Sequence, residues 1–191
     1  LVTISTIFVK QNHLKGYQEE LLFAKALTIL EYLQMIQNQV KDPDDSLYNL
    51  IDAEQIVLLG FAEDGEAATL ATIMNKTNYF QINTLITVAP TTTLDLTKLA
   101  NKIDDLNYLM LFSGHDAITP QLNKSFYNKI NFSSGNFTAK AIVNLYRANQ
   151  VQYSSLSNKG DWPLLGGLLL NQKQVIEADK QKNITRTIIT A

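Results

Sequence analysis

The sequence contains no cysteine, which excludes disulfide bonds and metal sites built on cysteine ligands. Arginine is scarce: Arg147 and Arg186 are the only two, and 16 basic residues are balanced by 18 acidic ones. The resulting net charge of −2 argues against a nucleic-acid-binding surface. No apolar run reaches the roughly 20 residues that a membrane span needs, and no signal peptide is visible. Because a lack of cysteine suits either side of a membrane, the redox compartment stays open.

The chain is long enough for one sizeable core. Its 191 residues are 46% hydrophobic, which is ordinary for a soluble globular domain. No repeat, low-complexity segment or long linker divides it, so we predict a single domain over residues 1–191. The sequence begins inside a strand-like segment and without an initiator methionine, which indicates the C-terminal part of a larger domain.

Strand-like and helix-like segments alternate along the chain. This alternation predicts an α/β fold, with a mostly parallel sheet flanked by helices. The expected strands are Leu1–Val9, Gln55–Phe61, Ile82–Ala89, Leu106–Ser113 and Ala139–Tyr146. The expected helices are Gln18–Val40, Glu63–Asn75, a short helix within Thr91–Asp105 that begins near Thr93, Gln121–Ile130 and Leu168–Thr187. The stretch Asn149–Gly167 is expected to be irregular.

One strand runs into a helix through a glycine-flanked turn. Gly60 is the next-to-last residue of the apolar run Gln55–Phe61, Ala62 follows that run, and Gly65 lies in the first turn of the helix expected from Glu63. A sharp turn of this kind lifts one side chain above the sheet, close to the positive end of a helix. It is the setting of a nucleophile elbow, G-x-S-x-G.

At this point the chain resembles α/β-hydrolases, in particular a bacterial lipase and esterase group whose elbow reads G-H-S-R-G-G-E-A. Gly60, Gly65, Glu66 and Ala67 match that string. The resemblance implies that Ala62 stands at the nucleophile position. Two later segments agree in order. Leu109–Asp116 resembles the strand that ends in the triad acid, and Ala141–Gln150 resembles the last strand with its G-A-N-H ending.

The resemblance therefore implies that Asp116 stands at the acid position and Gln150 at the histidine position. Ala62 has no nucleophilic atom, and the amide of Gln150 cannot accept a proton near neutral pH. Asp64 replaces the glycine that keeps the elbow tight. We expect a catalytically inactive hydrolase-like protein with a binding or structural role, because losing nucleophile and base removes the triad-dependent rate. All three positions are expected at one end of the sheet.

Two other functions are considered. One is an active serine esterase or lipase that uses Ser113 or Ser154 with His115 instead of the usual positions. The other is a subunit of a larger assembly. The resemblance allows a secreted or cell-envelope location, but the sequence leaves localisation and ligand open.

Clusters of acidic residues raise the question of metals. Glu63, Asp64 and Glu66 are interpreted as charges that favour the start of a helix. The aspartates at positions 42, 44 and 45 lack the glycine and distal glutamate of a calcium loop. No metal or cofactor is expected.

A last expectation concerns the sheet. The resemblance implies the strand order 1-2-4-3-5-6-7-8, in which the five strands of this chain are the fourth to the eighth. Leu1–Val9 would then lie roughly 10 Å from Gln55–Phe61. The strand between them would come from a missing N-terminal segment or from another protein chain. Direct pairing of Leu1–Val9 with Gln55–Phe61 would instead indicate a simpler doubly wound sheet with only a local likeness to hydrolases.

Overall fold

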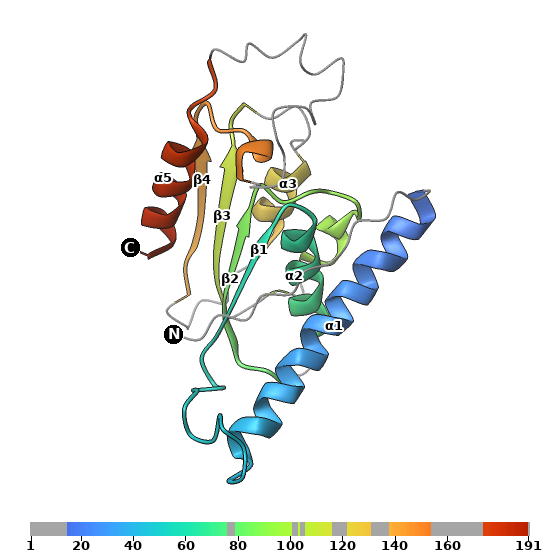
Figure 1. The fold of residues 1–191 in the computed structure, drawn as a ribbon. Coiled ribbons are helices and arrows are strands. Elements are labelled where there is room, and N and C mark those ends of the chain that lie inside the picture. Colours follow the sequence, from blue (N-terminus) through green and yellow to red (C-terminus); the bar gives the residue numbers. More distant parts are fainter. Residues whose placement is uncertain are drawn as a thin grey trace.

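The computed structural model describes residues 15–75, 79–100, 103, 106–115, 122–130, 138–153 and 174–190 (Figure 1). Within these residues, four strands form one sheet. They are β1 (Ile56–Phe61), β2 (Ile82–Val88), β3 (Asn107–Ser113) and β4 (Lys140–Leu145). The strands lie in the order β1-β2-β3-β4, and every neighbouring pair is parallel. The predicted α/β class is therefore confirmed. The expected strand at residues 1–9 lies outside the described residues.

Helices cover both faces of the sheet. They are α1 (Lys15–Lys41), α2 (Glu63–Met74), α3 (Leu122–Lys129) and α5 (Ala178–Thr190), with short 3₁₀ turns η2 (Leu96–Lys98) and η4 (Gln150–Tyr153). Figure 1 shows α2 and α3 on one face and α5 on the other. α1 packs against α2 on the outside of the helical layer. The molecule is thus a three-layer α/β structure.

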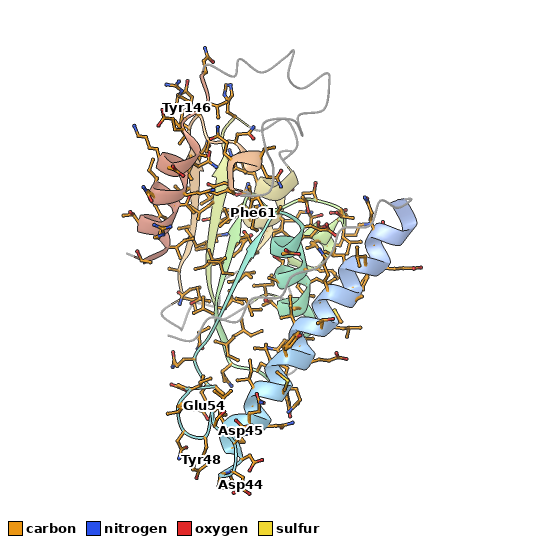
Figure 2. The ribbon with its side chains drawn as sticks, viewed as in Figure 1. Asp44, Asp45, Tyr48, Glu54, Phe61 and Tyr146 are labelled. Carbon is orange, nitrogen blue, oxygen red and sulfur yellow. The ribbon has the colours of Figure 1, made fainter. Side chains whose placement is uncertain are left out.

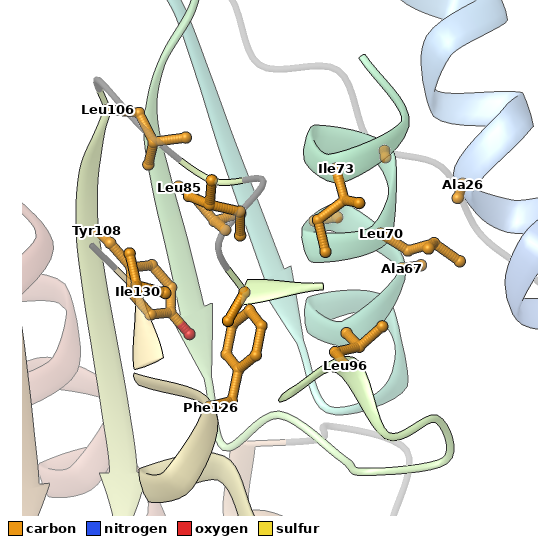
Figure 3. Close-up of a cluster of buried hydrophobic side chains, with 14 of the residues drawn as sticks. Ala26, Ala67, Leu70, Ile73, Leu85, Leu96, Leu106, Tyr108, Phe126 and Ile130 are labelled. Carbon is orange, nitrogen blue, oxygen red and sulfur yellow. The ribbon is translucent and has the colours of Figure 1, made fainter. Parts of the chain in front are cut away.

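Two apolar cores follow from this layering. On the face of α2 and α3, side chains such as Leu70, Leu85 and Phe126 form the larger core, shown in Figure 3. On the other face, Leu111 and Leu145 meet the apolar side of α5. Central strands are apolar on both faces, which is why they appear in the sequence as nearly continuous hydrophobic runs.

Two helix predictions need correction. The short helix expected to begin near Thr93 is the single turn η2, which starts later because the Asp95 carboxylate accepts a hydrogen bond from Thr97 N–H. The closing helix does not include residues 174–177 and begins at Ala178. The Ile176 N–H donates to the Arg147 carbonyl at 3.0 Å, which ties this segment to the end of β4 rather than to a helix. Residues 168–173 lie outside the described residues.

Candidate functional site

The turn between β1 and α2 has an uncommon backbone conformation. Ala62 has φ 52° and ψ −122°, a combination that residues with a side chain rarely adopt. Its N–H donates to the Val88 carbonyl at 2.9 Å, and its own carbonyl accepts from the N–H groups of Gly65 and Thr91 at 3.1 and 3.2 Å. These bonds to the helix and to the end of β2 hold Ala62 in the strained geometry. The turn predicted from the sequence is present, with a methyl group at its apex.

Two glycines let the strand and the helix approach closely. A Cβ atom added to Gly60 would lie 2.4 Å from the Asp64 carbonyl oxygen and 2.5 Å from the Gly65 Cα. One added to Gly65 would lie 3.0 Å from the Gly60 carbonyl oxygen. This contact does not need a glycine at position 64, where the chain has Asp64. The Asp64 side chain points to α1, where the Lys25 ammonium lies 2.9 Å from the Asp64 carboxylate and 3.4 Å from that of Glu63.

The strain at Ala62 gives a first prediction. Ala62→Gly should stabilise the protein by about 1 kcal/mol, because relief of roughly 1–3 kcal/mol of backbone strain exceeds the extra chain entropy of glycine. The control is Ala67→Gly in the buried part of α2, which should destabilise by about 1 kcal/mol or more. Urea unfolding of both variants measures the difference. A loss of stability in both variants would mean that position 62 is not strained.

Glu66 holds the loop that follows β2. Its side chain is 2% exposed. One carboxylate oxygen accepts from the Thr91 hydroxyl at 2.9 Å and from the Thr93 N–H at 2.8 Å, and the other accepts from the Leu94 N–H. The sequence interpretation took Glu66 as a charge at a helix start and missed this role. The one available signal was that Glu66 matches the glutamate of the G-G-E-A string, whereas the neighbouring acidic residues do not match it.

Gln150 lies directly after β4, in η4. It is 8% exposed, and its amide oxygen Oε1 has no hydrogen-bond partner among the described residues. The segment before it is fixed by its neighbours: the His115 N–H donates to the Ala148 carbonyl, and the Asn149 side-chain amide donates to the His115 carbonyl, both at 2.9 Å. These two hydrogen bonds link the segments that follow β3 and β4, immediately before Gln150 in the chain.

Ala62 and Gln150 are located at the same end of the sheet. All four strands are parallel, Ala62 follows β1, and Gln150 follows β4. The rings of Phe61 and Tyr153 bridge this edge, with centroids 5.5 Å apart. Figure 2 shows Phe61 at this end. Asp116, the residue at the acid position, lies outside the described residues.

The alternative nucleophile Ser113 is buried at the end of β3, with 1% of its surface exposed. Its Oγ has no hydrogen-bond partner among the described residues. Nearby, burial raises the pKa of the Tyr153 phenol, and the hydrogen bond between that phenol and the Thr185 hydroxyl opposes the shift. No hydrogen bond joins Ser113 to His115 within the described residues, and the Nε2 atom of His115 has no partner there. The two residues are therefore not arranged as a nucleophile and its base. Ser154 lies outside the described residues.

Gln181 of α5 anchors the end of β4. It is fully buried, its Oε1 accepts from the Asn149 N–H at 2.9 Å, and its Nε2 donates to the Asn149 carbonyl at 2.8 Å. The side chain satisfies a backbone donor and a backbone acceptor at once, as a neighbouring strand would. The sequence predicted a helix over Leu168–Thr187, which contains Gln181, but nothing in the local pattern distinguished this amide from the exposed polar residues beside it.

The aspartates of residues 42–45 stabilise turns. Asp42 and Asp45 accept hydrogen bonds from the N–H groups of Asp44 and Leu47, as turn residues do. Figure 2 places Asp44 and Asp45 at the end of the molecule opposite to Phe61. No group of three or more histidine, aspartate or glutamate side chains converges on a metal-sized site within the described residues.

No protein-family model matches this chain, and no curated protein sequence matches it. Among the described helices, none combines the length and the apolar character that crossing a bilayer requires.

Proposed function

We propose that this protein is a catalytically inactive, α/β-hydrolase-like protein whose role is binding or assembly. The observation that carries the proposal is the backbone of Ala62. The residue keeps the strained conformation of an elbow while it carries a methyl group. A strained turn that carries no nucleophile fits a protein that has retained the hydrolase-like backbone but no longer catalyses hydrolysis.

The residue at the histidine position supports the same reading. Gln150 is buried at the same end of the sheet as Ala62, where the hydrolase resemblance would put the base for a nucleophile. A glutamine amide can donate and accept hydrogen bonds but cannot take up a proton in the neutral range. Buried polar atoms that lack a protein partner are suited to a bound polar group or an ordered water.

A cavity beside the elbow is a candidate for the binding role. It has a volume of about 200 Å³ and lies under the loop that Glu66 holds. Its wall combines the polar residues Thr69, Thr91 and Thr93 with the aromatic residues Tyr108 and Phe126. A cavity near the carboxyl ends of parallel strands is in the usual place for a ligand in this fold class.

Two alternatives stay open to experiment. An active esterase that uses Ser113 and His115 would need both groups to reach a substrate, and the burial of Ser113 opposes this. In a subunit role, another protein chain would cover the side of β1 that has no described strand beside it. Mass analysis of the native particle separates a subunit from a free binding protein.

The proposal predicts no ester hydrolysis. Short-chain and long-chain acyl esters should not be turned over, and a fluorophosphonate probe should not label the protein. Ala62→Ser should not restore either reaction, because Gln150 supplies no base. Ala53→Ser, at the opposite end of the sheet, is the matched control for the added hydroxyl. Hydrolysis that is abolished by Ser113→Ala or His115→Ala would establish the esterase alternative instead.

A further inference from the structure

The cavity under the loop that Glu66 holds has the size of a site for one small molecule. Its volume is about 200 Å³. A cavity of about 150 Å³ holds a benzene molecule, whereas drug-sized ligands need roughly 300–1,000 Å³. The lining residues come from α2, β3 and α3 and from residues 90–97, which follow β2. A ligand of this cavity is therefore somewhat larger than benzene.

Many hydrogen-bond donors of the lining residues are already used within the protein. The Thr91 hydroxyl and the N–H groups of Thr93 and Leu94 all donate to the Glu66 carboxylate. On α2, the Thr69 hydroxyl donates at 2.8 Å to a backbone carbonyl one turn earlier. A hydroxyl whose hydrogen is engaged in this way can only accept a further bond. These residues thus offer a ligand lone pairs rather than hydrogens.

Both charged residues in the cavity wall are acidic. They are Glu66 and Asp95, and none of the described residues that line the cavity is a lysine, an arginine or a histidine. Asp95 accepts hydrogen bonds from the hydroxyl and the N–H of Thr97, and the hydroxyl bond lowers the pKa of this carboxyl. Asp95 is also exposed, so its charge can meet an incoming ligand. Such a wall attracts a cation and repels an anion.

The remaining wall is apolar and aromatic, with Leu96, Met110, Tyr108 and Phe126. The rings of Tyr108 and Phe126 meet edge to face, with centroids 6.3 Å apart, and both side chains are buried. Figure 3 shows Phe126 between Tyr108 and Leu96 in this view. Aromatic rings bind the apolar part of a ligand and also attract organic cations. The ligand is therefore expected to have an apolar body beside its hydrogen-bond donors.

We propose that this cavity binds a small organic ammonium ion. The amine hydrogens would bind acceptor oxygens of residues 91–97, and the apolar part would pack against Met110 and Phe126. A neutral alcohol of the same shape lacks the charge, and a carboxylate has the charge that the wall repels. This inference rests on the proposed binding role of the protein and specifies the class of its ligand.

Three probes of nearly the same shape test the ligand class: benzylammonium, benzyl alcohol and benzoate. Each is titrated into the isotope-labelled full chain at neutral pH, and the amide chemical shifts are followed by nuclear magnetic resonance. Benzylammonium should shift the amides of residues 91–97 and bind about tenfold more tightly than benzyl alcohol, because hydrogen bonds between charged groups are stronger than neutral ones. Benzoate should cause no shift at these residues.

Asp95→Asn isolates the contribution of charge. Asparagine keeps an oxygen that can accept from the Thr97 N–H, so the loop should be retained. The affinity for benzylammonium should fall about two- to fivefold, as expected for an exposed ion pair, and that for benzyl alcohol should not change. Asp45→Asn is the matched control, because Asp45 also accepts from an N–H two residues later and lies at the opposite end of the molecule from Phe61 (Figure 2). It should leave the affinity for every probe unchanged.

Several outcomes would overturn the proposal. They are equal affinities for benzylammonium and benzyl alcohol, binding that leaves the amides of residues 91–97 unshifted, and no binding of any probe. Equal losses in Asp95→Asn and Asp45→Asn would show attraction to an acidic protein surface rather than to this cavity. Ester hydrolysis would contradict the proposed loss of catalysis whether or not the probes bind, so the two failures are distinguishable.

Discussion

Glu66→Ala is expected to destabilise the protein by about 4 kcal/mol. The substitution removes the carboxylate that accepts bonds from the Thr91 hydroxyl and from the N–H groups of Thr93 and Leu94. Hydrogen bonds to a charged group contribute roughly 1.5–3 kcal/mol each, and buried donors left without a partner add to the cost. The effect is large for a domain whose total stability is about 5–15 kcal/mol. Denaturant unfolding followed by circular dichroism measures it.

The matched control is Glu31→Ala, at an exposed position of α1. This change should alter the unfolding free energy by less than about 0.5 kcal/mol, because exposed helical positions tolerate alanine well. Equal effects at positions 66 and 31 would show that the carboxylate of Glu66 does not organise the loop. A loss at Glu66 that is recovered in part by Glu66→Gln would fit retention of one acceptor oxygen.

Gly60→Ala is the second substitution with a large expected effect, about 3 kcal/mol or more. The new methyl would lie 2.4 Å from a backbone oxygen and 2.5 Å from a backbone carbon, so the start of α2 must move. Rigid backbone cannot yield as the end of a flexible side chain can, and overpacking usually costs about 1–3 kcal/mol even in side-chain cores. The midpoint of urea unfolding is the measured quantity.

Gly65→Ala serves as the comparison within the same contact. Its new Cβ would lie 3.0 Å from the Gly60 carbonyl oxygen and 3.4 Å from the Pro90 Cβ, which is a much milder approach. Because alanine favours a helix by about 1 kcal/mol over glycine, the net loss should be well below that of Gly60→Ala. If the order of the two losses were reversed, the strand and helix would not meet at Gly60.

Much of the fold was accessible from hydrophobic patterning. The four described strands agree with the predicted ones to within about one residue at each end, because buried parallel strands give short continuous apolar runs. α1 was predicted from apolar positions at helical spacing. The start of α5 was predicted wrongly. The hydrogen bond from the Ile176 N–H to the Arg147 carbonyl joins residues far apart in sequence, so no local pattern indicates it.

The site was accessible only where it depends on local chain geometry. Gly60 and Gly65 predicted a tight turn at Ala62, and the positive φ of that alanine agrees with this. The roles of Glu66 and Gln181 depend on partners in the loop after β2 and at Asn149, more than twenty residues away. Glutamate and glutamine are common on exposed helix surfaces, so the sequence did not show that these two side chains are buried.

The order of the strands has a consequence for synthesis on the ribosome. Gly60 pairs with Thr87, Thr87 with Met110, and Met110 with Ile142, so each strand joins the one made just before it. Every pairing closes a loop of similar length, and closure entropy rises only slowly with length. The sheet can therefore grow in one direction as the polypeptide emerges, without waiting for distant segments. α5 is synthesised after all four described strands, so it can pack on a sheet that has already formed, where Gln181 accepts a hydrogen bond from Asn149.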